Sequence, residues 1–497
     1  MHKVPECTSP ETITRKKGVV MGQEVKEKSA ESSGHTFVPK HQIRERFSRA
    51  MSDMYKKEVP LYGELLDIVR DINREHLEAH PDLEDEVGSL DRVSEERHGA
   101  IRLGKPEELA NMARLFGVMG MVPVGYYDLS VANLPVHSTA FRPIDEDELA
   151  KNPFRVFTSL LRTDLLDDDT CRQVIHSLSD REIFTPGTIE LININENQGG
   201  LTADQTDAFI REALETFRWH SEARVPQEQY EKFLKSSGLV ADIASFKGPH
   251  INHLTPRVLD IQKLHKRMQE MGIETIPEVQ GPPAGWPVLL QQTSFRALVE
   301  TIRFPDGNGN YVEGRHRARF GEIEQRHTAL KPEGMAIYDR LIAKAKQQGN
   351  ELKKEGEEVY REKYPGMLAD LFEKEFPART KDELRRQNLG YFIYRKTKKG
   401  EQHPEAIQAE QNGQSTHQLL EKLIQEGLVK ATPITYEDFL PVSAAGIFKS
   451  NLDEKSGLVE SGEASDQRLL EKALGGKVAD YHDLYRRQEE LSVRNVL

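Results

Sequence analysis

The sequence predicts an α+β protein in which two similar strand–helix–strand units are joined and flanked by long helical segments. Its 497 residues are too many for one compact domain and suggest two to four structural units. The same order of elements, a histidine-headed strand, an amphipathic helix, a glycine and further strands, occurs twice, beginning at His98 and at His253. The remaining segments place apolar residues at helical spacing among many charged ones.

The amino-acid composition indicates which kinds of partner and which cellular compartment to expect. The net charge is −13, from 68 Lys and Arg against 81 Asp and Glu, which argues against nucleic acid as the main partner. No apolar run reaches the roughly 18–20 residues needed to cross a bilayer, so we expect no membrane partner. Only two cysteines are present, a usage typical of a reducing compartment, and we expect a cytoplasmic protein. Nothing in the sequence indicates an oligomeric state.

Changes in residue composition and in hydrophobic periodicity along the chain predict how it is divided into regions. The first residues lack the apolar core of a signal peptide and are polar, as disordered segments are. The expected regions are a disordered N-terminal extension (1–38), a helical N-terminal segment (39–95), a first barrel module (96–146), a helical insertion (147–247), a second barrel module (248–330), a charged helical region (331–430), and a substrate loop with a C-terminal tail (431–497).

The first unit begins with RHGAIRL (97–103), a strand-like run. PEELANMARLFGVM (106–119) is an amphipathic helix that opens with proline and two glutamates, and Gly120 ends it as a C-terminal glycine does. VPVGYYDLS (122–130) and LPVHSTAF (134–141) follow as extended segments.

The second unit repeats this order. PHINHLTP (249–256) is extended, VLDIQKLHKRMQEM (258–271) is helical, and Gly272 closes the helix. Extended segments follow at 288–298, 299–305 and 317–326, with a glycine-rich turn at 306–310. Both units therefore carry a histidine at the start of their first strand.

Two histidines and one carboxylate on one face of a metal leave positions open for substrate and oxygen, as in non-haem iron(II) oxygenases. Alternation along a strand puts His98, Ala100 and Arg102 on one face. His250 and His253 point to opposite faces, and His253 is the one that heads its unit. Glu322 and Glu324 share a face, so alternation does not choose between them. For each histidine the alternative is an ordinary packed core residue.

The segment FGEIEQRH (320–327) resembles the last-strand motif of 4-hydroxyphenylpyruvate dioxygenase, an iron(II) enzyme of the vicinal oxygen chelate superfamily. In that motif the glutamate three positions before the Gln-Arg pair is a metal ligand, which corresponds to Glu322, whereas Glu324 falls on a position that is not a ligand. The two histidine-headed units resemble the paired βαβββ modules of that superfamily, which form a half-open barrel around one metal. The implied fold is therefore two such modules with large helical insertions.

The stretch from about Phe37 to Leu452 is similar to the 2-oxoadipate dioxygenase/decarboxylase family of lysine breakdown. The segments that carry this likeness are ERHGAIRLG, MGMVPVGYYDLS, LPVHSTAFRP, FTSLLRTDLL, GPHINHLTPRVLDI, FGEIEQR and YEDFLPVSAAGIFKSNL. The resemblance implies conversion of 2-oxoadipate and O₂ into 2-hydroxyglutarate and CO₂. It also implies iron(II) bound by His98, His253 and Glu322, and substrate contacts at Arg102, Val442 and Ser443.

The residue chemistry is compatible with such a substrate, a small 2-oxo dicarboxylic acid. Arg102 can bind a carboxylate with two parallel hydrogen bonds. The small residues at 443–446 let backbone N–H groups approach an anion, or simply form a packed turn. His137 and Arg142 are candidates for supporting the metal ligands, although His137 could equally be a packed strand residue.

Two other functions are compatible with the same residues. One is a redox-neutral lyase or isomerase that uses a divalent metal only as a Lewis acid. The other is a non-catalytic module that binds a small molecule.

Overall fold

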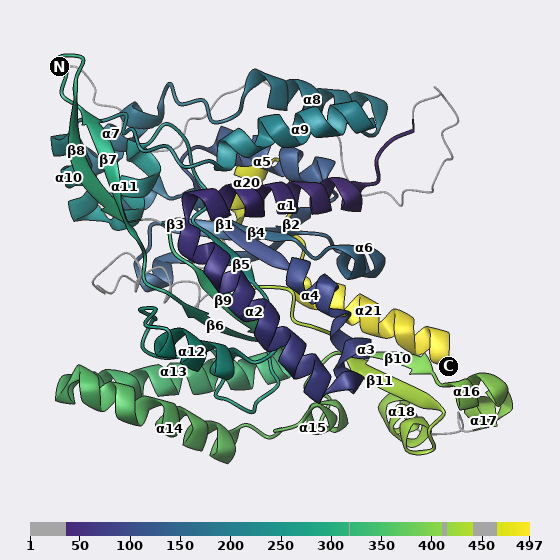
Figure 1. Ribbon diagram of the computed structural model, residues 1–497. Helices are drawn as coiled ribbons and strands as arrows, with labels where there is room; N and C mark the ends of the chain where they lie inside the picture. Colours follow the sequence, from purple (N-terminus) through teal and green to yellow (C-terminus); the bar gives the residue numbers. More distant parts are fainter. Residues whose placement is uncertain (1–35, 318, 410–414, 441–464) are drawn as a thin grey trace.

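Most strands of the two units lie in the middle of the molecule, with helices on both sides (Figure 1). The computed structural model describes residues 36–317, 319–409, 415–440 and 465–497. Almost all of the expected disordered extension, residues 1–35, is outside these ranges. The α+β class predicted from the sequence is confirmed. Within the described ranges, none of the helices is both long and apolar enough to cross a membrane.

The first unit has the strand, the helix and the two following strands that its sequence predicts, and one further strand. They are β1 (Arg97–Leu103), α5 (Pro106–Val118), β2 (Val122–Asp128), β3 (Val136–Arg142) and β4 (Arg155–Leu161). β4 pairs in parallel with β1 and antiparallel with β3, which gives the order β2-β3-β4-β1. Gly120 follows α5 with φ of +72°, the left-handed conformation that ends a helix most readily at glycine.

The fourth strand of this unit lies where the sequence predicts the start of the helical insertion, so the boundary at residue 146 is wrong. RVFTSLL forms β4, and every one of its residues is buried. A strand covered on both faces lacks the alternation of apolar and polar residues that marks a half-exposed strand. The helices expected in the insertion follow only after β4.

The second unit repeats the order of the first. It comprises β5 (His253–Pro256), α12 (Ile261–Glu270), β6 (Leu290–Ser294) and β9 (Glu322–Arg326). β6 pairs antiparallel with β9, and β9 lies beside β5 through a parallel bridge. Residues 275–280 bridge to the other side of β6 at two points. The hairpin of β7 (Val299–Pro305) and β8 (Tyr311–Arg317) is inserted between β6 and β9.

The two units meet where β1 and β5 pair antiparallel. His98 lies opposite Thr255, and Ala100 lies opposite His253. Residues paired across two strands share a face of the sheet, so both histidines point the same way. Gly99 allows this close approach, because a Cβ there would lie 2.6 Å from Ile251 Cδ1 and 3.3 Å from the carbonyl oxygen of His253.

Helices cover the sheet from regions before and between the two units. The helices before β1 are α1 (Lys40–Glu58), α2 (Pro60–Ala79), α3 (Glu84–Val87) and α4 (Leu90–Glu95). Those between the units are α6 (Glu146–Lys151), α7 (Asp168–Leu178), α8 (Pro186–Gln198), α9 (Ala203–Leu214), α10 (Gln227–Ser236) and α11 (Gly238–Ser245). α1 packs on α9 and α5 on α8, and their apolar faces merge with the sheet into one core.

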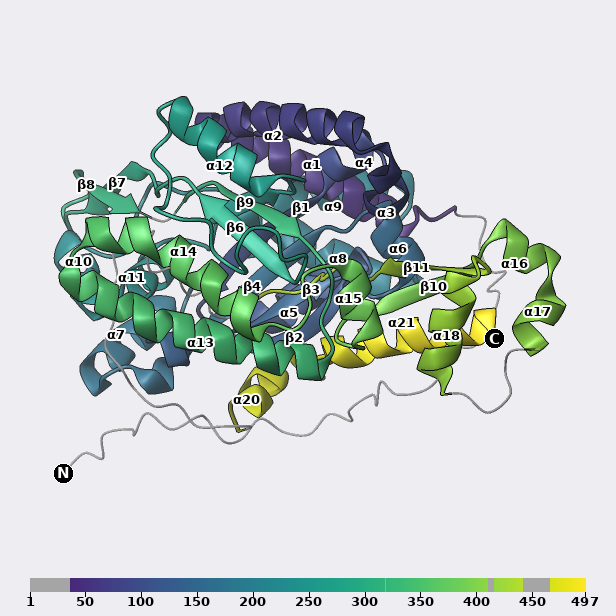
Figure 2. The same cartoon turned by 90° about the horizontal axis from the view of Figure 1, so that it is seen from below.

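The C-terminal third forms a second core beside the sheets, visible below them in Figure 1. Its helices are α13 (Pro332–Glu355), α14 (Glu357–Glu375), α15 (Lys381–Arg386), α16 (Lys398–Gln402), α17 (Pro404–Ala409), α18 (Thr416–Gln425) and α21 (Tyr481–Val496). In contrast, α20 (Ser465–Leu474) packs on α5 and β3 and belongs to the first core. The antiparallel strands β10 (Phe392–Lys396) and β11 (Val429–Pro433) lie among the helices of the second core, with α21 beside β10 (Figure 2). The expected charged helical region over 331–430 thus also contains β10, a strand whose partner β11 lies more than thirty residues further along the chain.

Replacing Gly99 tests the close approach of β1 and β5. Gly99→Ala should lower the free energy of unfolding by about 1–3 kcal/mol, because the added methyl group overlaps Ile251. Gly117→Ala in α5 is the matched control. A Cβ at Gly117 meets nothing within 4 Å, and alanine favours a helix. Urea unfolding of both variants measures the difference, and equal stability would contradict the packing argument.

Candidate metal centre

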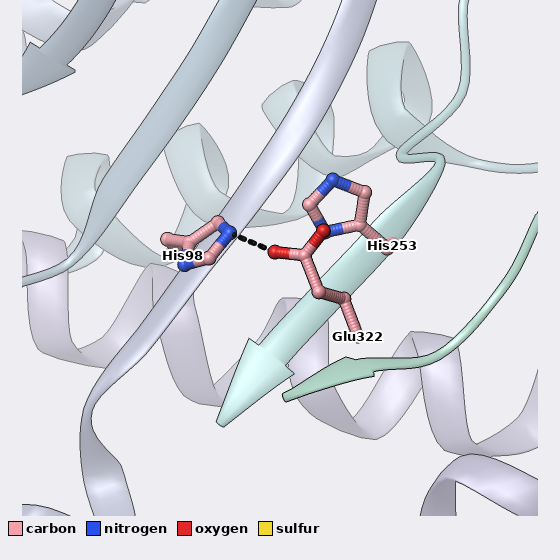
Figure 3. A group of neighbouring side chains, drawn as sticks. All are labelled: His98, His253 and Glu322. Carbon is pink, nitrogen blue, oxygen red and sulfur yellow. Dashed lines mark hydrogen bonds and ion pairs between the residues drawn. The ribbon is translucent and has the colours of Figure 1, made fainter. Parts of the chain in front are cut away.

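Three side chains from three strands converge on one buried point. His98 comes from β1, His253 from β5 and Glu322 from β9, and one ligand atom of each lies within 4.8 Å of those of the other two (Figure 3). His98 Nε2 is 2.8 Å from Glu322 Oε1, and the two imidazole rings are 5.4 Å apart and nearly perpendicular. In the described part of the chain this is the one group of His, Cys, Asp or Glu side chains with such spacing.

Neighbouring polar groups hold Glu322 in place. Gln292 Nε2 donates to Glu322 Oε1 over 2.8 Å, and Thr255 Oγ1 donates to the same oxygen over 3.2 Å. Thr255 Oγ1 also lies 2.9 Å from His253 Nδ1. The threonine hydroxyl therefore links two of the three converging side chains, and its place two residues after His253 puts it on their face of the sheet.

The other nitrogen of His98 faces a second carboxylate. His98 Nδ1 is 3.0 Å from Glu324 Oε2, while Nε2 faces Glu322. Glu324 also accepts two hydrogen bonds from Arg326. The two glutamates that strand alternation leaves equivalent are thus distinguished by the ring nitrogen each one faces.

Burial and charge set the ionisation of these groups. Burial lowers the pKa of His253 to about 4, so its ring is neutral at neutral pH. Burial opposes ionisation of Glu322, but His253 and His98 outweigh it and lower the pKa of that carboxyl. Burial also lowers the pKa of His98, yet the charges of Glu324 and Glu322 outweigh it and raise the value overall. Arg326 and His98 lower the pKa of Glu324 to about 2 against the cost of burial.

Aromatic rings enclose the cluster. The Phe439 ring lies 4.9 Å from His98 and nearly perpendicular to it, and the Phe320 ring lies 4.8 Å from His253. Both phenylalanines are buried. The polar groups are therefore set in an apolar surround that limits access of water and strengthens electrostatic interactions.

Arg102 lies four residues after His98 on β1, and therefore on the same face of the strand. Its Nη1 donates to Asp242 Oδ2 over 2.6 Å, from α11 in the helical insertion. His316 Nε2 on β8 lies 3.0 Å from the other oxygen of Asp242. Although burial opposes ionisation, His250, Arg102 and His316 together hold the pKa of Asp242 far below its usual range.

Comparison with known proteins identifies the family of the chain. Residues 47–451 match the family model of the 2-oxoadipate dioxygenase/decarboxylase. The chain belongs to the 2-oxoadipate dioxygenase/decarboxylase family. A relative of that name from Pseudomonas putida is 47% identical over 463 residues, which is 92% of this chain and 97% of the relative. One from Escherichia coli is 47% identical over 458 residues, 91% and 97% of the two chains.

A solved structure supports the same assignment. The crystal structure of the hydroxyglutarate synthase from Pseudomonas putida in complex with 2-oxoadipate superposes with a TM-score of 0.80 at 45% identity. The match covers 93% of this chain and 98% of that one. The resemblance to the 2-oxoadipate dioxygenase/decarboxylase family seen in the sequence is therefore confirmed.

The structure brings together some of the expected site residues and leaves others apart. His98, His253 and Glu322 converge, whereas the expected substrate contacts Val442 and Ser443 lie outside the described residues. Arg142 does not contact the cluster directly. It forms two hydrogen bonds to Asp438 and so holds the segment that carries Phe439.

His137 packs elsewhere on β3. Its ring is 6.0 Å from that of Tyr126, and burial and the charge of Arg162 lower its pKa to about 4. Its contacts are those of a packed strand residue, which was the alternative to a supporting role.

Several residues of the site were not found from the sequence. Gln292 and Phe439 reach the cluster from other segments of the chain, and Asp242 reaches Arg102. Thr255 and Phe320 carried a local signal, since each lies two residues from a converging side chain, His253 and Glu322 respectively.

The buried pair of Arg102 and Asp242 can be tested against a surface pair. Asp242→Asn should lower the free energy of unfolding by about 3–5 kcal/mol, because it leaves the Arg102 charge buried without its carboxylate. Asp180→Asn is the control, since Asp180 pairs with Arg224 at the surface and its loss should have no measurable effect. Chemical unfolding compares the two, and a stable Asp242→Asn protein would show that the pair is dispensable.

Proposed function

We propose that this chain is an iron(II)-dependent enzyme that converts 2-oxoadipate and O₂ into 2-hydroxyglutarate and CO₂. The reaction balances in atoms: 2-oxoadipic acid (C₆H₈O₅) and O₂ give 2-hydroxyglutaric acid (C₅H₈O₅) and CO₂, and the carbon that leaves is the carboxylate next to the keto group. The observation that carries the proposal is the convergence of His98, His253 and Glu322 in a chain of this family. The relatives' names supply the substrate and the type of reaction.

The three side chains fit an iron(II) ion. Two imidazoles and one carboxylate are the donor set of non-haem iron(II) oxygenases, and they leave positions open for other ligands. Bound there, iron(II) would supply O₂ activation and a Lewis acid for the 2-oxo carboxylate. Thr255 and Gln292 orient Glu322, while Phe320 and Phe439 keep bulk water from the cluster.

Arg102 is suited to hold the distal carboxylate of the substrate. It lies on the same face of the sheet as His98, and its guanidinium is fixed by Asp242 on one edge. A planar guanidinium can bind two carboxylates through different edges. In this proposal Val442 and Ser443 provide further substrate contacts, as the family resemblance implies.

We also propose that the two units are modules of the vicinal oxygen chelate type and form a half-open barrel. The supporting feature is the repeated strand order, with the first strands of the two units paired at the centre. The reducing environment that iron(II) requires is consistent with a cytoplasmic enzyme.

Oxygen uptake provides the direct test. The chain is loaded with iron(II) without air and then given 2-oxoadipate and O₂. We expect O₂ consumption, CO₂ release and 2-hydroxyglutarate in equal amounts. His98→Ala, His253→Ala and Glu322→Ala should each abolish turnover, because each removes one of three ligands. Absence of O₂ uptake with any 2-oxo acid would disprove the proposal.

The same experiment separates the two other functions. Turnover without O₂, supported by zinc or nickel, would indicate a redox-neutral lyase or isomerase. A chain that binds no metal, and whose His98→Ala variant still binds the ligand, would be a binding module.

Arg102 can be tested with paired substrates. Arg102→Ala should raise KM for 2-oxoadipate by about 30-fold or more, since removing one partner of a buried charged hydrogen bond costs about 2–5 kcal/mol. 2-Oxohexanoate has the same chain with a methyl group in place of the distal carboxylate. Its KM should change far less, so that the preference for the dicarboxylate disappears.

Iron content is the control for this experiment. The Arg102→Ala protein should bind as much iron as the unaltered chain. A parallel loss of iron, or an equal rise of KM for both substrates, would show that Arg102 supports the structure instead.

A further inference from the structure

Glu324 occupies an unusual place beside the proposed metal ligands. It is fully buried, with an exposed fraction of 0%, and lies two residues after Glu322 on the same strand. Its Oε2 is 3.0 Å from His98 Nδ1, on the side of the ring away from Glu322. The proposed function gives this carboxylate no role.

Arg326 holds both oxygens of Glu324. Its Nε donates to Oε1 over 2.7 Å and its Nη2 to Oε2 over 2.8 Å, a two-point grip that fixes the carboxylate plane. Its remaining nitrogen, Nη1, donates to the carbonyl oxygens of Tyr436 and Asp438. Arg326 thus ties Glu324 to the segment that carries Phe439, whose ring packs against the His98 ring.

This geometry decides which nitrogen of His98 is available to a cation. His98 Nδ1 and Glu324 Oε2 are 3.0 Å apart, without the alignment of a full hydrogen bond. A carboxylate held by arginine can only accept, so this short contact favours the ring form with its proton on Nδ1. In a neutral imidazole the lone pair is then on Nε2, the nitrogen directed at Glu322. The same contact fixes the rotation of the ring.

We propose that Glu324 is a positioning residue that, held by Arg326, orients His98 and directs its Nε2 toward the metal. This inference rests on the proposed function, because it assigns a role toward the same ion. Carboxylates that accept from the second nitrogen of a ligand histidine also make that ligand more basic. Glu324 therefore contributes to metal affinity without binding the metal.

Two other roles for Glu324 are less compatible with the structure. As a metal ligand it would have to release Arg326, which occupies both of its oxygens. As a purely structural partner of Arg326 it would not need to face His98, and its loss would affect stability alone. Metal affinity, measured apart from turnover, distinguishes these roles.

The test measures binding of cobalt(II), an air-stable probe, by calorimetry and by its visible absorption. Glu324→Gln should weaken binding by about 10–100-fold and shift the cobalt spectrum, because the amide is a weaker acceptor for Nδ1. Arg326→Lys keeps the charge but loses the two-point grip, and should weaken binding in the same direction. If Glu324→Gln does not fold, the Arg326→Lys protein decides the question.

Glu108→Gln is the matched control. Arg181 holds Glu108 by Nε over 2.8 Å and by Nη2 over 2.7 Å, a buried pair of the same geometry whose other contacts are the backbone of Gly104 and Lys105. This variant should lower the melting temperature but keep the cobalt affinity and spectrum of the unaltered chain.

The outcomes separate this proposal from the proposed function. If the unaltered chain binds cobalt and the Glu324 and Arg326 variants bind it equally well, the positioning role is wrong and the metal site stands. If the Glu108 variant loses as much affinity as the Glu324 variant, the effect is one of stability and the positioning role is again wrong. If the unaltered chain binds no cobalt while His98→Ala leaves its properties unchanged, both proposals fail.

Discussion

The site depends on the antiparallel pairing of β1 with β5. This one contact joins the two units and sets the register that puts His98 and His253 on a common face. Because side chains alternate along a strand, a slip of one residue would turn His253 to the opposite face of the sheet. Gly99 permits the close approach, and β9 then lies beside β5 so that Glu322 completes the group. The convergence of the three proposed ligands therefore depends on this register.

Much of this arrangement was readable in the sequence because it is encoded locally. The strand that carries His98 and the helices closed by Gly120 and Gly272 follow from patterns within a few residues. The choice of His253 over His250 followed from comparing the two repeated units. The choice between Glu322 and Glu324 does not, since both face the same way along β9. That choice came from the family motif, and the structure adds a physical reason. The two glutamates face different nitrogens of the same ring.

What the sequence did not predict is non-local. β4 was missed because both its faces are covered, so it has no alternating pattern. β10 was missed because its partner, β11, comes more than thirty residues later. Asp242 reaches Arg102 from a helix 140 residues further along the chain, and no periodicity in either segment signals that contact. Such pairs are set by how elements pack, which one sequence alone does not specify.

The insertions are part of the site and do not merely cover it. α11 supplies Asp242 and the β7–β8 hairpin supplies His316, and together they fix a guanidinium on the face that carries the proposed ligands. A buried ion pair gains little net stability, because the cost of removing both charges from water offsets their attraction. Stability alone therefore does not explain why arginine and carboxylate pairs surround the cluster. Their two-point hydrogen bonds fix the orientation of both side chains, which apolar packing would not do. Such fixed orientation is what a site needs if it is to position three metal ligands and a group that binds the substrate carboxylate.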